Sequence, residues 1–358
     1  MDSRLVTLFG EMVRIDSESG DEEAFIEYVR ALLERDLGAD CRLDGYGNLI
    51  ARVAAKGSER GEPILLAAHG DTVKPGKGIE PVVRDGVVRS VGETILGADD
   101  KAGVAAVLEA VRTAPRRPPV EIVITREEEV GLVGAKHLDL SLVSAKAGFI
   151  IDGEDPDVIV IGGPSHVSLD VTITGKAAHA GVEPEKGISA IRAAALAITN
   201  QPTGRIDEET TANIGTIHGG LIRNGVPERV TIQAECRSLN HDKCMRQAET
   251  MRRAFEDAAA SFGAKADVKV TLEYEASRVP EGSPAVQLAK RAIAAVGLEP
   301  KTQVITGGTD ALILASRGLD AVVLGYGGQA AHTTDESITV DALEQSVAVL
   351  RHLLEAAA

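Results

Sequence analysis

The stretch VEIVITREEEVG, residues 120–131, joins an apolar run typical of a buried strand to three consecutive glutamates. A strand that enters a core does not normally end in adjacent carboxylates, because a buried carboxylate is costly unless paired, hydrogen-bonded or bound to metal. If the chain stays extended, Glu127 and Glu129 lie on one face and Glu128 on the other. The three glutamates cannot then share one role, but the alternation of side chains along a strand does not say which of them is functional. A solvated acidic loop without function is the alternative.

Two other segments place acids or a histidine at the end of apolar runs. PILLAAHGDTV, residues 63–73, carries His69 and Asp71, which share a face in an extended chain, as a metal ligand and its orienting carboxylate do. AGFIIDGE ends its apolar run in Asp152, with Glu154 shortly after it. Taken alone, each is equally compatible with an ordinary polar residue at a strand end.

Two loops add further candidates. GADDKAG places Asp99 and Asp100 at the start of a predicted helix, where either is a candidate N-cap, and QAAHTTDES places His332 after LGYGG. Sites in open α/β sheets form at the carboxyl edge, and divalent ions take oxygen and imidazole ligands. Together the segments predict a metal site at that edge.

Composition excludes several classes of protein. The 358 residues carry a net charge of −16, which argues against nucleic acid or an anionic membrane as partner. Three cysteines without a CxxC pair argue against a disulfide framework or a thiolate zinc site. Neither a signal peptide nor an apolar run of about 18 residues is apparent, so we expect a cytoplasmic protein.

The apolar pattern divides the chain into two domains. Helical and strand patterns alternate in residues 1–164 and again in 277–358, as in an α/β layer fold. Residues 165–276 combine period-two strands with two helices, as an α+β domain does. We expect an α/β domain interrupted by a smaller α+β domain, with a cleft between them.

The expected elements follow from the same patterns. A helix over 21–37 is predicted to have Ser19 or Asp21 as its N-cap. Other helices are predicted over 99–114, 187–199, 241–263, 285–297 and 340–357, and strands over 63–73, 120–129, 147–154, 166–179, 228–239, 266–276, 301–306 and 320–327.

In their order and spacing these motifs resemble the dinuclear zinc exopeptidases, a family that includes tripeptidase (peptidase T), glutamate carboxypeptidase and aminoacylase. The resemblance covers nearly the whole chain and is nearest to peptidase T-like aminopeptidases. It implies an α/β, phosphorylase/hydrolase-like catalytic domain with a mixed central sheet flanked by helices, and an inserted α+β lid of the dimerisation type. The motifs that carry it are AAHGDTV, GADDKAG, EEEVG, FIIDG, GGTDA and AHTTDES.

The resemblance implies two divalent metal ions, with zinc expected and cobalt or manganese as alternatives. His69, Asp99 and Asp152 would hold one ion. Asp99 would also bind the other ion, together with Glu129 and His332.

The resemblance also implies catalytic roles. Glu128 would be the general base for attack by a hydroxide that bridges the metals, and Asp71 would orient the first histidine ligand. Asp100 and Glu127 would have no direct role.

Four residues match substrate contacts of the family. His179 would reach the substrate carbonyl, often from a partner's lid, and Arg237 would bind a carboxylate. Asn213 and Thr309 would add polar contacts. Peptidase T proper has an arginine where this chain has Thr306, so one anchor for the peptide's terminal carboxylate is absent.

The implied function is removal of N-terminal residues from short peptides, such as di- and tripeptides, by a two-metal peptidase, with a homodimer through the lid. Asp152 favours an aminopeptidase or dipeptidase, since carboxypeptidases and deacylases of the family tend to carry glutamate there. An N-acyl amino acid deacylase or carboxypeptidase is the alternative within the family. A non-catalytic metal-binding or scaffold protein is the alternative outside it.

Overall fold

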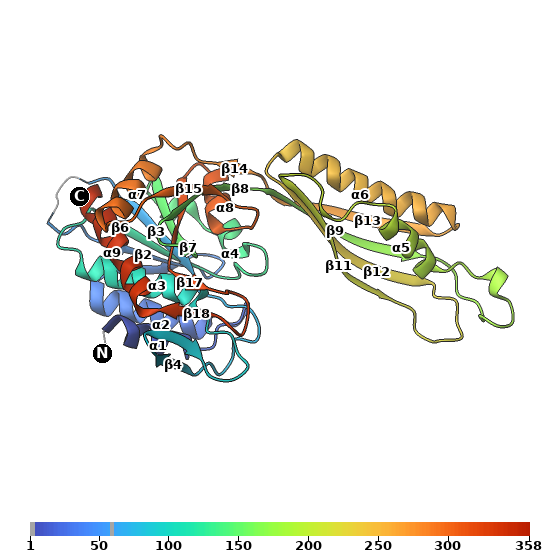
Figure 1. The fold of residues 1–358 in the computed structure, drawn as a ribbon, viewed down its shortest axis with the longest axis horizontal. Coiled ribbons are helices and arrows are strands. Elements are labelled where there is room, and N and C mark those ends of the chain that lie inside the picture. The colour runs from blue at the N-terminus through green and yellow to red at the C-terminus, as the bar shows by residue number, and fades with distance from the viewer. Residues whose placement is uncertain (1–3, 58–60) are drawn as a thin grey trace. The chain divides into compact units, whose positions relative to one another are not determined.

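The computed structural model describes residues 4–57 and 61–358. Residues 1–3, which belong to the N-terminal stretch in which no signal peptide was expected, lie outside the described residues. The chain divides into two compact units. The first comprises residues up to Gly162 together with Arg278–Ala358, and the second is Gly163–Ser277. Figure 1 labels the elements of both. Within the described residues, no helix combines the length and the apolar character needed to cross a bilayer.

The first unit is built on a nine-stranded mixed sheet in the order β1-β2-β6-β3-β7-β16-β8-β14, with β15 paired to β8. Strands β6, β3, β7 and β16 run parallel, whereas β1, β2 and β8 are antiparallel to their neighbours in that order. The strands are β1 (Asp40–Leu43), β2 (Leu49–Val53), β3 (Ile64–His69), β6 (Val120–Thr125), β7 (Ala147–Gly153), β8 (Val158–Gly163), β14 (Ser277–Arg278), β15 (Lys301–Val304) and β16 (Asp320–Gly325).

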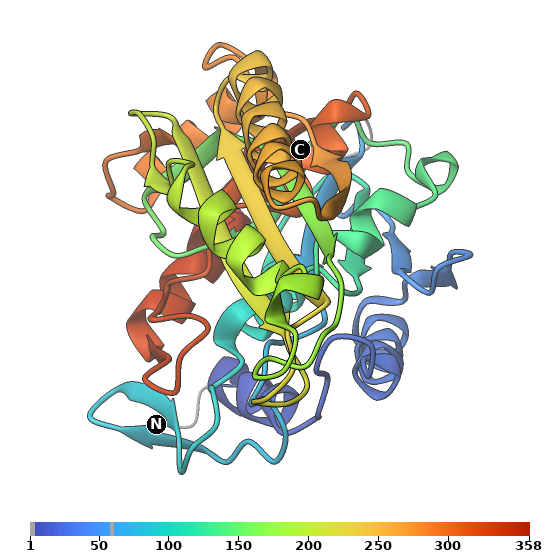
Figure 2. The same ribbon diagram turned by 90° about the vertical axis from the view of Figure 1, so that its right-hand side faces the viewer.

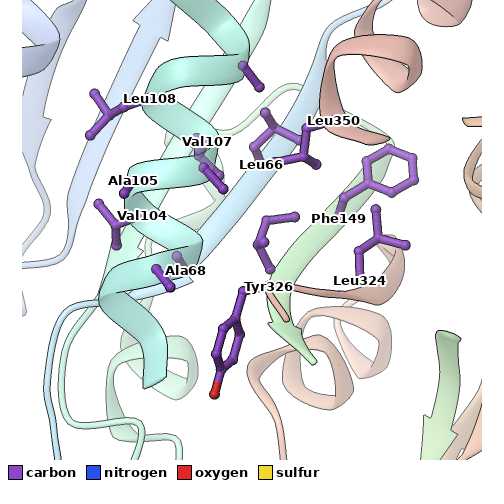
Figure 3. Close-up of a cluster of buried hydrophobic side chains, with 14 of the residues drawn as sticks. Leu66, Ala68, Val104, Ala105, Val107, Leu108, Phe149, Leu324, Tyr326 and Leu350 are labelled. Carbon is purple, nitrogen blue, oxygen red and sulfur yellow. The ribbon is translucent and has the colours of Figure 1, made fainter. Parts of the chain in front are cut away.

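Helices cover both faces of this sheet, which confirms the predicted fold class. Strands β3 and β6 are buried along their whole length, and this explains their uninterrupted apolar sequence. On one face, Leu66 and Phe149 pack with Val107 of α3 and Leu350 of α9, as Figure 3 shows. The helices are α1 (Arg4–Val13), α2 (Glu23–Leu37), α3 (Ala98–Thr113), α4 (Val133–His137), α7 (Pro284–Ala295), α8 (Asp310–Ser316) and α9 (Val340–Ala357).

A small second sheet of the first unit has the order β17-β18-β5-β4. It consists of β17 (Gly328–Gln329), β18 (Ser337–Thr339), β5 (Val87–Ser90) and β4 (Pro81–Arg84). The loop between β17 and β18 carries His332. This sheet therefore fixes both ends of the loop on which a candidate ligand lies.

The second unit is a five-stranded antiparallel sheet in the order β10-β11-β12-β9-β13, with two helices on one face (Figures 1 and 2). Alternate residues of β9 are buried, so the period-two pattern of the sequence reflects one face against the helices. The elements are β9 (Ser165–Thr174), α5 (Ala190–Thr199), β10 (Gly204–Arg205), β11 (Thr210–Gly219), β12 (Arg229–Ser238), α6 (His241–Ser261) and β13 (Lys265–Tyr274).

The start of α2 differs from the prediction. Glu22 occupies the N-cap position and makes no side-chain capping bond. Ser19 instead donates a hydrogen bond of 2.7 Å to Oδ2 of Asp71, and Asp21 accepts one from Lys77. Neither Ser19 nor Asp21 is the cap, because each is engaged by a group outside the helix.

The start of α3 is also not capped by its acids. Gly97 precedes the helix with a left-handed backbone, and no side-chain cap bond forms. Asp99 and Asp100 both have non-helical dihedral angles. Their carboxylates are consequently available for contacts beyond the helix.

Candidate metal centre

Histidine and carboxylate side chains converge at the carboxyl edge of the central sheet. The register of the parallel strands places His69 opposite Thr125 and Ala67 opposite Ile150. His69 is the last residue of β3, and Asp152 is the last but one of β7. Parallel pairing therefore brings residues far apart in sequence to one edge of the sheet.

The two ring nitrogens of the buried His69 face different groups. Nδ1 lies 3.0 Å from the carbonyl oxygen of Asp71 and 3.4 Å from its Oδ1. Nε2 lies 3.0 Å from Oδ1 of Asp99 and 3.8 Å from Oδ1 of Asp152. With the proton on Nδ1, where the carbonyl accepts it, Nε2 keeps its lone pair for a metal ion. Asp71 thus orients His69 more closely through its backbone than through its carboxylate.

Asp99 lies between the two histidines. Its Oδ1 faces His69, and its Oδ2 lies 3.2 Å from Nε2 of His332. The same Nε2 lies 2.9 Å from Oε1 of Glu129. A carboxylate with one oxygen toward each histidine has the arrangement that a ligand shared by two ions requires.

Thr309 contacts a candidate ligand. Its Oγ1 donates a hydrogen bond of 3.2 Å to Oδ2 of Asp152, whose Oδ1 is the oxygen nearer His69. Thr309 is 2% exposed and directly precedes α8. The threonine of the GGTDA motif therefore holds Asp152, in addition to lining the cavity described below.

Asp100 also lies within reach of a metal bound by His69 and Asp152, because one ligand atom from each of the three falls within 4.8 Å of the others. Its Oδ2, however, accepts the backbone N–H of His69 at 3.2 Å. Asp100 is fully buried, and burial raises its pKa well above the usual value. Asp99, in contrast, lines the adjoining cavity.

The three glutamates leave the sheet in a turn. β6 ends at Thr125, and Glu127 has a left-handed backbone with φ of 50°. The extended chain on which the alternation of Glu127 and Glu129 depended is therefore absent. Asp71 fixes the turn, since its Oδ1 accepts the N–H of Glu128 at 2.9 Å and its Oδ2 accepts that of Glu129 at 3.1 Å.

The centre concentrates buried negative charge. Burial and then the charge of Asp99 raise the pKa of Asp152 well above its usual value. Burial and then the charge of Asp152 do the same to the pKa of Glu128. The adjacent carboxylates of Asp99 and Glu129 raise the pKa of His332 to about 10. Added positive charge would stabilise the ionised forms of Asp152 and Glu128, which burial and the neighbouring carboxylates disfavour.

The side chains present fit two divalent ions. Oε1 of Glu129 is buried and accepts no hydrogen bond of good geometry from any described residue, although Nε2 of His332 is 2.9 Å away. A buried oxygen left in this way is costly, and an ion shared with His332 and Asp99 would satisfy it. Zinc, cobalt and manganese all accept imidazole and carboxylate ligands, so the donor set does not choose among them.

These groups line a cavity of about 690 Å³ in the first unit. Glu128 lines it but belongs to neither of the two groups of candidate ligands. Tyr326, from LGYGG, also lines it; the sequence offered only a glycine-rich segment as a signal for this residue. The apolar part of the wall comes from β8, β15 and β16 and from the chain next to β15, and includes Val158, Val160, Val304, Ile305 and Val323.

Three predicted substrate residues lie in the second unit, where Asn213 and Arg237 both adjoin Glu235 in the sheet and His179 lines a separate cavity. His179 lines a cavity of about 780 Å³ with Asn224. Asn213 pairs with Glu235 in the sheet and is not among the described residues that line this cavity. Arg237 donates a hydrogen bond of 3.0 Å to Glu235. Asn224 is a candidate that sequence reasoning missed; the only signal in the sequence is a loop flanked by glycines.

Comparisons with known proteins give the class. Residues 65–356 match the model of peptidase family M20/M25/M40, and the chain belongs to this family. It is 40% identical to the uncharacterized protein YqjE of Bacillus subtilis (strain 168), over 100% of this chain and 99% of that one.

Two solved structures narrow the class further. Aminopeptidase PepT from Bacillus cereus ATCC 10987 is 40% identical with a TM-score of 0.88, over 99% of this chain and 98% of that one. A tripeptidase from Staphylococcus aureus subsp. aureus Mu50 is 35% identical with a TM-score of 0.92, over the same shares. Within its family the chain is a peptidase T-like metallo-exopeptidase.

Proposed function

We propose that the enzyme removes N-terminal residues from short peptides at a centre of two divalent ions. The observation that carries this proposal is the charge of the cavity. Of the described residues that line it, six are acidic and none is lysine or arginine. The acidic residues are Asp99, Glu128, Glu129, Asp152, Glu154 and Asp155.

The acidic lining favours a substrate with a free amino group. Three of the carboxylates would be neutralised in large part by the metals that they bind. Glu154 and Asp155 are exposed and lie in the connection between β7 and β8. Their charge at the cavity favours a protonated amine over a carboxylate. A substrate that reached this cavity with a carboxylate or a blocked amine would lose that attraction.

We propose that His69, Asp99 and Asp152 hold one ion and that Asp99, Glu129 and His332 hold the other. When bound, such ions polarise a peptide carbonyl and lower the pKa of water toward neutrality. The described geometry supports the assignment, because Asp99 presents one oxygen to each histidine.

Glu128 is the proposed general base. Its carboxylate lies on the cavity wall, so it can take a proton from water and deliver it to the leaving amine. Its backbone is held by Asp71, which also holds the neighbouring ligand Glu129. One carboxylate thereby sets the spacing between the base and the metal ligand.

The second unit would supply further substrate contacts. Arg237 is the candidate for the terminal carboxylate, and its buried Nε has no hydrogen-bond partner among the described residues. His179 and Asn224 share a cavity and are candidates for polar contacts to the peptide. Asn213 is a weaker candidate than Asn224, because it lies in the sheet away from His179.

Free and N-acetylated peptides test the proposed substrate class. With the same short peptide in both forms, kcat/KM is expected to fall at least about 100-fold on acetylation, because the ammonium group loses its acidic partners. Liquid chromatography of the digests gives both the rates and the end at which cleavage starts. Faster cleavage of the acetylated form would favour a deacylase or carboxypeptidase, and no hydrolysis by metal-loaded protein would favour a scaffold.

A homodimer through the second unit is part of the proposal. Val182, Leu221 and Ile222 are 74%, 96% and 68% exposed, and exposed apolar groups of this kind are typical of interaction surfaces. Multi-angle light scattering is expected to give twice the mass of one chain. The double variant Leu221→Glu, Ile222→Glu is expected to be monomeric with unchanged helix content by circular dichroism. A monomeric wild-type protein would contradict the proposal.

A further inference from the structure

Glu336 is a buried acid whose carboxylate contacts the turn before α3. It is 2% exposed and belongs to the same loop as His332. Its Oε2 accepts the backbone N–H groups of Leu96 and Gly97, each at 2.7 Å, and its Oε1 accepts that of Asp99 at 3.0 Å. Three charge-assisted hydrogen bonds thus compensate a carboxylate that would otherwise be costly to bury.

The N–H groups that Glu336 accepts belong to the turn before α3. The first N–H groups of a helix have no partner within it, and no side chain caps this one locally. Glu336 therefore caps the turn from another part of the chain, 237 residues away from Asp99. Because Asp99 is itself one of the bonded residues, its backbone position depends on this contact.

We propose that Glu336 is a positioning residue of the metal centre, which holds Asp99 against the loop that carries His332. This inference rests on the proposed two-metal function. The two ends of the contact carry the two groups that must meet at one ion, the carboxylate of Asp99 and the imidazole of His332, now 3.2 Å apart. Glu336 links the backbone of Asp99 to the loop that carries His332, so this contact is in place before any ion binds.

Glu336→Gln separates this role from simple packing. The amide keeps the size of the side chain but replaces one accepting oxygen by an NH₂ group that faces backbone donors. Loss of an outer partner of this kind typically costs about 10- to 100-fold in metal affinity. The expected change is weaker binding of the ion proposed for Asp99, Glu129 and His332. A smaller loss is expected for the ion proposed for His69, Asp99 and Asp152, because only Asp99 of these three ligands lies at the Glu336 contact.

Glu121→Gln is the matched control. Glu121 is 4% exposed, and its carboxylate likewise accepts backbone N–H groups, those of Ser144 and Ala145. It lies near the start of β6, whereas the metal centre lies beyond the end of that strand. Its replacement is expected to lower stability but leave both metal affinities unchanged.

Equilibrium dialysis of metal-stripped protein against zinc gives the affinities, and the absorption of bound cobalt reports the geometry at each site. Wild type is expected to bind two ions, and Glu336→Gln to bind one of them at least about 10-fold more weakly. If Glu336→Gln does not fold, Glu336→Asp, which keeps the charge and shortens the reach, is expected to show the same loss.

Thermal melts of metal-free and metal-loaded protein distinguish positioning from stability. The rise in Tm on adding metal is expected to shrink in Glu336→Gln and to persist in Glu121→Gln. If the Glu336 variants bound both ions with wild-type affinity, or if Glu121→Gln lost as much metal affinity as they do, the inference about Glu336 would be wrong. The proposed two-metal function would be unaffected by either result. A wild-type protein that binds fewer than two ions would overturn the proposed function and this inference with it.

Discussion

Glu128→Gln is expected to lower kcat by about 100- to 10,000-fold, the usual contribution of a general base, while two metal ions stay bound. The amide cannot accept the proton of water, so the step that Glu128 serves is lost. Metal content is expected to persist because Glu128 lies outside both groups of candidate ligands. The backbone bond from Glu128 to Asp71 does not involve the altered atoms, so the turn is expected to keep its shape.

Glu127→Gln is the control for this substitution. Glu127 lies in the same turn, but its carboxylate accepts a hydrogen bond from Tyr46, and it is not among the described residues that line the cavity. The kcat of Glu127→Gln is expected to stay within about threefold of wild type, because the altered carboxylate contacts Tyr46 and is not part of the described cavity lining. Elemental analysis beside the kinetics decides the assignment: stoichiometric loss of metal from Glu128→Gln would make that residue a ligand.

Asp99→Ala is expected to abolish tight binding of both ions and to lower kcat/KM by at least about 1,000-fold. The substitution removes the two oxygens that face His69 and His332, so neither histidine keeps its shared partner. Metal ions contribute several kcal/mol to charge stabilisation, and each 1.36 kcal/mol is about tenfold in rate. Dialysis against zinc and the rate with a free tripeptide measure the two effects.

His332→Ala sharpens the test of Asp99 as a shared ligand. It is expected to lose one ion and retain the other, because His332 faces only one of the two proposed positions. Asp341→Ala, in the exposed first turn of α9, is the control and is expected to bind two ions. Retention of one tightly bound ion by Asp99→Ala would show that Asp99 serves a single metal.

The fold could be predicted from the sequence because its two hydrophobic patterns, continuous apolar runs and alternation of apolar with polar residues, have different physical causes. Strands such as β3 and β6 are buried on both faces and read as continuous apolar runs, whereas β9 alternates because only one face is covered. Short strands that interrupt loops, such as β4 and β10, carry too few residues for either period to be visible. Both were missed for that reason.

The convergence of His69, Asp99, Asp152 and His332 could be predicted only in part. Polar residues after apolar strands indicate a shared edge, since parallel strands end on the same side. The preference for Asp99 over Asp100 came from the family resemblance, because the helical period does not distinguish two adjacent acids at the non-helical start of α3.

Strand geometry could not separate the three glutamates, because the chain leaves the extended conformation at Glu127. The contacts of Glu336 and the position of Asn224 depend on partners far away in sequence or in another loop. Local patterns contain no signal for such contacts.

The place of β16 in the central sheet has a consequence for how the chain matures during synthesis. Strands β7 and β8 are neighbours in sequence, yet β16 lies between them in the sheet and is made only after the whole second unit. The second unit is continuous in sequence and has all its strands as soon as Ser277 leaves the ribosome. The second unit is therefore expected to fold first. The central sheet of the first unit cannot be completed until β16, Asp320–Gly325, has been made and can insert between β7 and β8. His332 is made later still, so the ion proposed for Asp99 and His332 can be bound only after the whole second unit and β16 have been made.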